Sequence, residues 1–378
     1  MIRIRILLTY FFFVFSYTVN AQNDTALTKK NFLQKALEAK DEAFLIAPIV
    51  SRTPDTRLNF SIDAIKYFKS NKKDTASTRS SHISLVADYS MNRQFKIGNS
   101  WMIYFKEDKY QSYGKVYFSN FPDVFYGVGN RTNVNDMEGF VYNKLIMFTN
   151  LLRELGNNDF YFGGSFRYNN YFDTNTENSP ILSEVNTLES IENQMLGVGV
   201  QFSIDKRNSY FYNYDGLYFN VTHHYHVPMF DFIEFQNTNI TFKKFFKLNK
   251  TGKDQIFAFH LQSDLNFGET IPFFELESLG GSKILRSYAA NRYRDRNFVG
   301  SQIEYRFPLF WRFRGAIFTG IGEVFNRTNE VRLDYLKYSY GGGLRFVINE
   351  ANMLQLRLDY GRGLGNSNAF YLGFGEAF

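Results

Sequence analysis

Charged residues and glycines crowd the stretch Gly280–Arg296, GGSKILRSYAANRYRDR. It holds one acid, Asp295, and five cations, which are Lys283, Arg286, Arg292, Arg294 and Arg296. Two glycines before a run of cations could form a phosphate-binding loop, and clustered Lys and Arg could contact nucleic acid. A third possibility is a loop that plugs another part of the molecule. These alternatives differ in the elements that they need on either side of the stretch.

Other glycine-containing stretches do not indicate a phosphate loop. Tyr340–Gly343 and Thr251–Lys253 both lack the order G-x-x-x-x-G-K-[S/T] before a helix. The net charge of +6 includes Arg3 and Arg5, which leave with the signal peptide described below. Since no dominant basic face is required, we expect no nucleic-acid partner.

Two histidines give the best candidate for a metal site. His224 and His226, in HHYH, would lie on one face of a strand. A zinc site needs three or four ligands, no third ligand is evident nearby, and the chain has no Cys. The sequence therefore predicts no metal site and no cofactor.

A nucleophilic pair is the other chemistry to consider. Ser263 and His260 belong to one candidate strand, but their odd separation places them on opposite faces, so they cannot meet. No other catalytic constellation is evident. We therefore expect that the protein is not an enzyme.

The first 21 residues have the pattern of a secretory signal peptide. Arg3 and Arg5 precede an apolar run from Ile6 to Tyr17, and Val19–Ala21 fits a cleavage site. The run is shorter than the roughly 20 residues that a membrane-spanning helix needs. After cleavage behind Ala21 we expect a short periplasmic segment at 22–41, either a disordered tail or a small plug with a short helix.

The rest of the chain alternates between apolar and polar residues over long stretches. Examples are FVGSQIEYRF at 298–307, FAFHLQSDL at 257–265 and LQLRLDY at 354–360. A period of two places alternate side chains on opposite faces of a sheet. Many of these segments approach or exceed about ten residues, which is long for a globular strand but typical of tilted strands that cross a bilayer. The sequence therefore favours a membrane barrel over a soluble sandwich.

The polar face of these strands is best placed inside such a barrel. Glu304, Arg306, Arg357 and Asp359 all fall on it. A charge that faces lipid at the midplane costs about 2–4 kcal/mol, whereas a charge in a polar lumen costs little. The sequence predicts an all-β, transmembrane antiparallel β-barrel at residues 42–378 of the cell outer membrane, surrounded by membrane lipids.

About sixteen strands are predicted. They lie near 44–50, 57–68, 81–90, 94–105, 109–119, 138–153, 158–172, 193–205, 215–226, 231–248, 255–266, 297–307, 312–324, 335–347, 352–361 and 369–378. The long connections 120–137, 173–192, 267–296 and 325–334 then share one rim, as extracellular loops do. The connection 70–80 is long for a periplasmic turn, which leaves the numbering of the first strands open.

The stretch 279–309 resembles the most diagnostic segment of the BamA/TamA-type outer-membrane superfamily, also called the bacterial surface antigen family. In that family the sixth extracellular loop of a sixteen-stranded barrel folds back into the lumen, with an Arg at its tip. The corresponding tip here is Leu285-Arg286-Ser287-Tyr288, followed by the strand motif Glu304-Tyr305-Arg306-Phe307-Pro308. The resemblance implies that Arg286 binds Glu304 inside the lumen and that the loop is an internal brace.

Three further segments carry the resemblance over residues 44–378. They are IDKRNSYFYNYDGLYF at 204–219, FPDVFYGVGN at 121–130 and FYLGFGEAF at the end of the sequence. The last is similar to the terminal strand signal that barrel-assembly machinery reads during biogenesis. The residues that would form this signal are Phe370, Leu372, Phe374, Gly375 and Phe378.

The sequence departs from the family pattern at two positions of the loop site. Ser287 replaces a Gly, which adds a Cβ where the backbone could need a positive φ. Gly320 stands where the family has an Asp that also binds the loop Arg, so Glu304 would be the remaining partner. The periplasmic POTRA modules of the family's insertases and secretion pores are absent from this sequence.

The resemblance implies a barrel that assists outer-membrane protein assembly or export together with periplasmic or outer-membrane partner proteins. An incoming strand would pair at a weak seam between the first and last strands. The alternative is a passive channel or a structural surface antigen without insertase activity.

Overall fold

The computed structural model describes residues 43–70, 79–156, 159–177, 179–183, 193–207, 212–229, 233–248, 255–349 and 353–378. The predicted signal peptide, the segment 22–41 and the turn at 251–254 lie outside the described residues. Among the residues that are described, no helix is long and apolar enough to cross a membrane.

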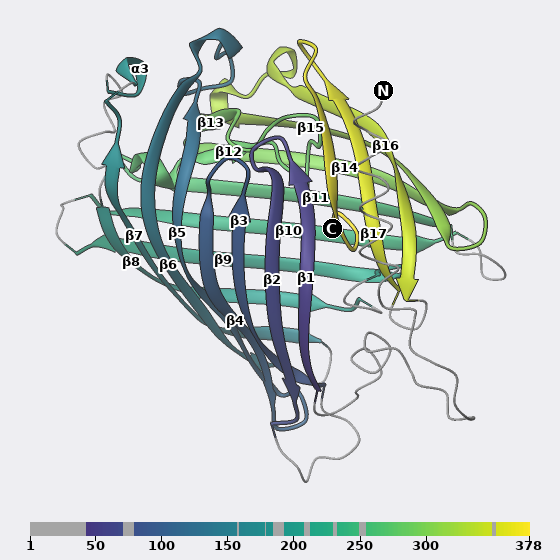
Figure 1. Ribbon diagram of the computed structural model, residues 1–378. Helices are drawn as coiled ribbons and strands as arrows, with labels where there is room; N and C mark the ends of the chain where they lie inside the picture. Colours follow the sequence, from purple (N-terminus) through teal and green to yellow (C-terminus); the bar gives the residue numbers. More distant parts are fainter. Residues whose placement is uncertain are drawn as a thin grey trace, which may run out of the picture. The chain divides into compact units, whose positions relative to one another are not determined.

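Sixteen antiparallel strands form a closed barrel, as predicted (Figure 1). They are β1 (Ala43–Thr53), β2 (Arg57–Phe68), β3 (Ser81–Ser90), β4 (Phe95–Phe105), β5 (Tyr110–Phe125), β6 (Glu138–Glu154), β7 (Phe160–Asn175), β8 (Asn193–Asp205), β9 (Gly216–Pro228), β10 (Phe235–Lys247), β11 (Ile256–Phe267), β14 (Asn297–Pro308), β15 (Phe313–Phe325), β16 (Lys337–Asn349), β17 (Leu354–Gly363) and β18 (Asn368–Phe374). Neighbours in sequence are neighbours in the barrel, and β1 closes it against β18.

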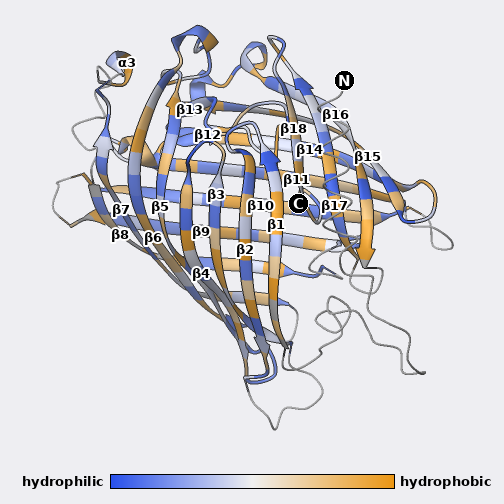
Figure 2. Ribbon diagram, viewed as in Figure 1, coloured by the Kyte–Doolittle hydropathy of each residue, from blue (hydrophilic) through white to orange (hydrophobic). Residues whose placement is uncertain are grey.

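Alternation of side chains along the strands gives the barrel two different faces. Leu358 and Tyr360 of β17 are 45% and 40% exposed, whereas Arg357 and Asp359 between and beside them are buried in the interior. The same alternation of apolar and polar positions runs along most strands (Figure 2). Because the exposed positions are largely aliphatic and aromatic, the outer surface suits lipid and the inner one suits water and ion pairs.

The connections also follow the predicted asymmetry. β2 ends at Phe68 and β3 begins at Ser81, so the long connection between them does not disturb the numbering of the first strands. On the opposite rim lie the long connections, which include a one-turn helix α3 (Pro180–Ser183) and the 29 residues from Gly268 to Arg296, hereafter the sixth loop.

Two features of the fold were not predicted from the alternation. The sixth loop contains a small sheet of its own, β12 (Glu277–Leu279) paired with β13 (Tyr293–Asp295), whose three-residue strands are too short to show a period. The last strand was predicted at 369–378, but β18 ends at Phe374. Gly375 has φ +72, a left-handed value that ends the extended backbone there.

We expect Ile317→Arg to destabilise the barrel by about 2–4 kcal/mol, because its side chain is 54% exposed on the outer face of β15 and would place a charge in lipid. The measurement is the denaturant midpoint in lipid vesicles. Ser100→Arg, at a position that lines an interior cavity, is the matched control and should shift the midpoint much less. Equal shifts would contradict the assignment of the two faces.

Candidate functional site

The tip of the sixth loop, Leu285–Tyr288, lies buried against the inner faces of the strands that follow the loop. All four of its residues are at most 1% exposed. Two of them, Leu285 and Tyr288, belong to one apolar cluster, whose other members are Leu279, Ile284, Tyr293, Phe298 and Val324.

Arg286 at the tip binds two carboxylates. Its Nη1 donates to Asp359 Oδ2 on β17 at 2.7 Å, and its Nη2 donates to Glu304 Oε2 on β14. All three side chains have no exposed surface. Burying a guanidinium is costly unless it is paired and hydrogen-bonded, so both carboxylates are needed to hold it there.

The structure thus brings together Arg286 and Glu304, and it adds a partner that the sequence reasoning missed. Glu304 is not the only acid left to Arg286, because Asp359 provides a second carboxylate. Gly320, at the position of the family's Asp, has no side chain to offer. The alternation of β17 had placed Asp359 in the lumen, but nothing in one sequence aligns β17 with the loop tip across two intervening strands.

One row of register-paired residues forms the seat of Arg286. Glu304 pairs with Phe318 on β15, Phe318 with Gly341 on β16, and Gly341 with Gly361 on β17. The Phe318 ring lies under the guanidinium, with Cζ of Arg286 3.6 Å from the ring centroid. This is a cation–π contact in a desolvated site.

Of the two glycines of this row, Gly361 leaves space for the loop tip and Gly341 leaves space for the Phe318 ring. A Cβ on Gly341 would lie 2.7 Å from Cζ of Phe318, and a Cβ on Gly361 would lie 1.7 Å from the carbonyl oxygen of Arg286. Any side chain at Gly361 would therefore collide with the backbone of the loop. The glycine on β17 is therefore required by the close approach of the sixth loop.

The replacement of Gly by Ser287 does not strain the tip in the way that was expected. The positive φ lies at Leu285, with φ +53, and not at Ser287. The backbone N–H of Ser287 donates to the Leu285 carbonyl at 2.7 Å, which tightens the turn. Ser287 also accepts a hydrogen bond from Ser367 Oγ through its carbonyl at 2.7 Å, which ties the tip to the β17–β18 turn.

Tyr288 fixes the other side of the tip. Its hydroxyl donates to the Tyr338 carbonyl at 3.0 Å and accepts from the Leu364 N–H at 2.9 Å. Its own carbonyl accepts from the Tyr371 hydroxyl at 2.8 Å. Burial raises the pKa of Tyr288 to about 12, so the phenol stays neutral and keeps its donor hydrogen at physiological pH.

The ion pair of Arg286 belongs to a larger buried network. Arg306 Nε donates to the free oxygen of Glu304 at 2.6 Å, and Arg345 pairs with Asp359. Arg345 Nε also donates to Glu376 Oε2 at 3.0 Å. Gly343 leaves room for this network, because a Cβ there would lie 2.0 Å from Oδ1 of Asp359.

The last residues after β18 also enter this network. Phe378, predicted to end the terminal strand, is 8% exposed in the lumen and stacks on His260 with ring centroids 5.0 Å apart. Its carbonyl oxygen accepts from Arg306 Nη2 at 3.1 Å. By contrast, Phe370 and Phe374 face outward at 47% and 38% exposure.

The segment of the terminal signal is thus divided between two faces. Phe370, Leu372 and Phe374 lie on β18, whereas Phe378 is turned inward beyond Gly375. The inward turn has a physical cause in Glu376, whose carboxylate lies 3.0 Å from Arg345 and 3.7 Å from Arg306. Whether assembly machinery reads these residues stays a prediction.

Arginines at the base of the sixth loop bind to β5, to the β5–β6 connection and to the start of the loop itself. Arg294 Nη2 pairs with Asp123 Oδ2 at 2.7 Å, and Arg292 donates to the hydroxyl and carbonyl oxygens of Thr132 at 2.7 and 2.8 Å. Arg296 donates to two carbonyls of its own loop. These side chains are occupied by protein partners, which leaves little of the cationic stretch for phosphate or nucleic acid.

The histidines considered as metal ligands make other contacts. His224 Nε2 hydrogen-bonds to Ser165 Oγ at 2.7 Å, and the His226 ring stacks on Phe235 at 4.4 Å. Over the described ranges, no group of three or more His, Asp or Glu is placed to hold a metal. His260 and Ser263 are both in β11, where His260 is buried under Phe378.

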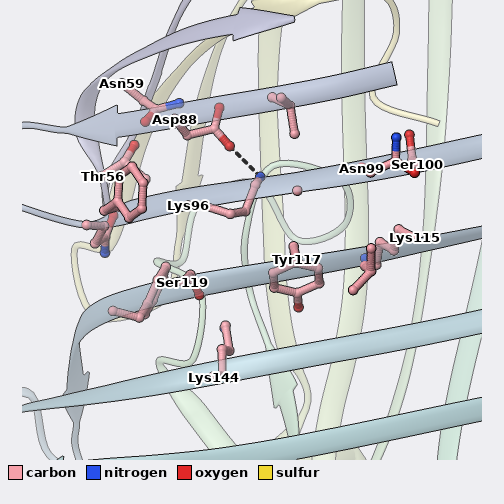
Figure 3. A pocket seen from close by; sticks show the side chains of 16 residues that line it. Thr56, Asn59, Asp88, Lys96, Asn99, Ser100, Lys115, Tyr117, Ser119 and Lys144 are labelled. Carbon is pink, nitrogen blue, oxygen red and sulfur yellow. Dashed lines mark ion pairs between the residues drawn. The ribbon is translucent and has the colours of Figure 1, made fainter. Parts of the chain in front are cut away.

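The other half of the lumen contains cavities. One of about 390 Å³ lies against β3 to β6, with Lys96, Lys115 and Lys144 in its wall (Figure 3). A second of about 370 Å³ shares Lys115 and Tyr117 with the first. A third of about 590 Å³ shares Ser100 with the first.

Comparison with known proteins identifies the family of this barrel. A model described as the Omp85 superfamily domain matches residues 75–378. Among solved structures, BamA from Haemophilus ducreyi lacking POTRA domains 1-3 aligns over 94% of this chain and 80% of its own, with a TM-score of 0.60 and 12% identity. CdiB from Acinetobacter baumannii aligns over 88% and 59%, with a TM-score of 0.57 and 13% identity. A search of curated protein sequences finds no match.

We expect Arg286→Ala to destabilise the folded barrel by about 3–5 kcal/mol, because it leaves Glu304 and Asp359 buried with less positive charge beside them. It should also expose residues 288–296 to protease in intact cells. Arg296→Ala, which removes only bonds to loop carbonyls, is the control. Unchanged protease sensitivity in Arg286→Ala would contradict the placement of the tip.

A second variant tests the seat without altering any charge. Gly361→Ala should displace the loop tip and raise protease sensitivity as much as Arg286→Ala does, since its Cβ would overlap the Arg286 carbonyl. Gly342→Ala is matched to it, because the nearest atom to its Cβ lies at 3.4 Å. If both glycine variants behave alike, the close approach is not what holds the loop.

Proposed function

This chain belongs to the Omp85 superfamily, and on that premise we propose that it assists the assembly or export of outer-membrane proteins. It acts from the outer membrane, where membrane lipids surround its apolar face. Its client is an unfolded strand-forming protein, and periplasmic or outer-membrane partner proteins deliver that client. The two structural relatives named above support a role in this class.

The observation that carries the proposal is the closure of the barrel. Within the described residues, β1 and β18 are paired in register at Arg52 and Leu372 alone, whereas β1 and β2 pair over eleven residues. β17 and β18 pair over seven. A seam with so few paired residues leaves backbone N–H and C=O groups of β1 and β18 available to another strand.

The sixth loop supports this role by stiffening the wall next to the seam. Its tip binds β14 and β17 directly through Glu304 and Asp359. Opening at β1–β18 would then leave β14 to β17 in place, because their register is fixed by buried ion pairs. The brace therefore makes β14 to β17 the rigid part of the barrel, and the boundary between β1 and β18 is the place where the barrel opens most easily.

A passive channel is the second candidate function, and the interior cavities favour it. The cavity of about 390 Å³ shares lining residues with each of the other two, and all three have charged and polar side chains in their walls. We propose no enzymatic activity: Ser165 and His224 are hydrogen-bonded, but among the described residues no group orients the ring at His224 Nδ1.

A disulfide across the seam tests the assembly role. Since the chain has no Cys, Arg52→Cys with Leu372→Cys would introduce one bridge at the paired position. In cells depleted of the native chain, the oxidised variant should fail to restore the levels of other outer-membrane proteins, and reduction should restore them. Those levels are measured by quantitative proteomics of outer-membrane fractions.

The matched control is Val50→Cys with Phe60→Cys, which bridges β1 to β2 and should leave function intact in both redox states. If depletion of the chain leaves the outer-membrane proteome unchanged, the assembly role is wrong. A large, steady and selective conductance of the oxidised variant in planar bilayers would then favour the channel.

A further inference from the structure

The cavity of about 390 Å³ between β3 and β6 has an unusual balance of charge. Three ammonium groups, on Lys96, Lys115 and Lys144, line it together with one carboxylate, on Asp88. Lys96 Nζ pairs with Asp88 Oδ2 at 2.5 Å, as the dashed line in Figure 3 shows. The difference, three positive charges minus one negative, leaves two positive charges on the cavity wall.

The other two lysines have no carboxylate in contact. Lys115 Nζ lies over the rings of Tyr117 and Phe148, at 5.1 and 5.2 Å from their centroids. Lys144 Nζ lies 4.5 Å from the Phe121 centroid and 3.5 Å from the Tyr142 hydroxyl. Neither forms an ion pair in the part of the chain that the structure describes.

This arrangement differs sharply from the filled half of the lumen. There Arg286, Arg306 and Arg345 each contact at least one buried carboxylate. These three arginines are thus matched with acids where the sixth loop packs, whereas two of the three lysines in the cavity wall have no carboxylate in contact. Unmatched like charges repel one another, so an anion that enters the cavity would relieve repulsion as well as gain attraction.

Neutral donors around the lysines complete a site for an oxyanion. Ser119 is 1% exposed and lines the cavity, and its Oγ has no hydrogen-bond partner among the described residues. The Tyr117 hydroxyl and the Asn59 amide lie in the same wall (Figure 3). Lys supplies point charges without a preferred plane, which suits a tetrahedral oxyanion.

We propose that this cavity binds a small soluble dianion of the phosphate class, held by Lys96, Lys115 and Lys144. Two uncompensated positive charges match the charge of about −1.5 to −2 that a phosphate group carries at pH 7. The cavity volume is many times the roughly 30 Å³ that one water takes in the liquid, so the cavity has room for a group larger than a single monatomic anion. The lumenal position excludes the acyl chains of a lipid, which lie on the other face of β4 to β6.

Binding of inorganic phosphate to the full chain in detergent micelles, followed by equilibrium dialysis at constant ionic strength, tests the proposal. The unaltered protein should bind phosphate saturably. Lys115→Gln with Lys144→Gln should weaken binding about tenfold, the order expected for two partly solvated charge pairs. Asp88→Asn should act in the opposite direction and tighten binding, because it removes the one acid of the wall.

Lys243→Gln is the matched control, since Lys243 is a lysine of β10 outside this cavity wall. The affinity of the Lys243→Gln variant for phosphate should stay within about twofold of that of the unaltered protein. Non-saturable binding, or an equal loss in Lys243→Gln, would overturn the site in favour of general attraction to the lumen. Binding of an acidic peptide but not of phosphate would overturn the ligand class. If the double variant does not fold, an unchanged or lower affinity in Asp88→Asn is itself sufficient to overturn the proposal.

Discussion

A buried guanidinium between two buried carboxylates constrains the whole wall from β14 to β17. Arg286 has no exposed surface, and neither do Glu304 and Asp359. Removing these charges from water costs several kcal/mol per ion, so the pairing is tolerable only with nearly complete hydrogen bonding. The strands must therefore present two acids, an aromatic ring and two glycines in fixed positions around one side chain from the loop.

That requirement explains residues that would otherwise weaken a sheet. Gly341, Gly343 and Gly361 lack the side chains that stabilise strands. Each leaves space for one member of the network: the ring of Phe318, the carboxylate of Asp359 and the backbone of Arg286. The loss of strand propensity is local, whereas the ion pairs that fill the space connect β14, β16, β17 and the sixth loop. We expect such a network to specify the strand register more than to add net stability.

The sequence was sufficient for the barrel and for half of the loop site. Alternation over about ten residues located all sixteen strands, because lipid on one side and water on the other demand it at nearly every position. The pairing partner Glu304 followed from the family motif. Asp359 and the inward position of Phe378 did not, because they depend on which residues of non-neighbouring strands share one register row and on a single left-handed glycine. The period of a strand contains no information on either.

The same network joins the sixth loop to the end of the last strand, and this bears on the seam. Asp359 and Glu304 contact Arg286 on one side, while Arg345 and Arg306 contact Glu376 on the other. Glu376 and Phe378 follow β18 directly, so residues just beyond the seam strand are held by buried charge inside the barrel.

An opening that moved only β1 away would leave these contacts intact and would expose β18 as a fixed edge. An opening that moved β18 would have to separate Glu376 from two arginines whose side chains are almost fully buried. If the seam opens as proposed, the charge network favours β1 as the side that moves and keeps β18 in place.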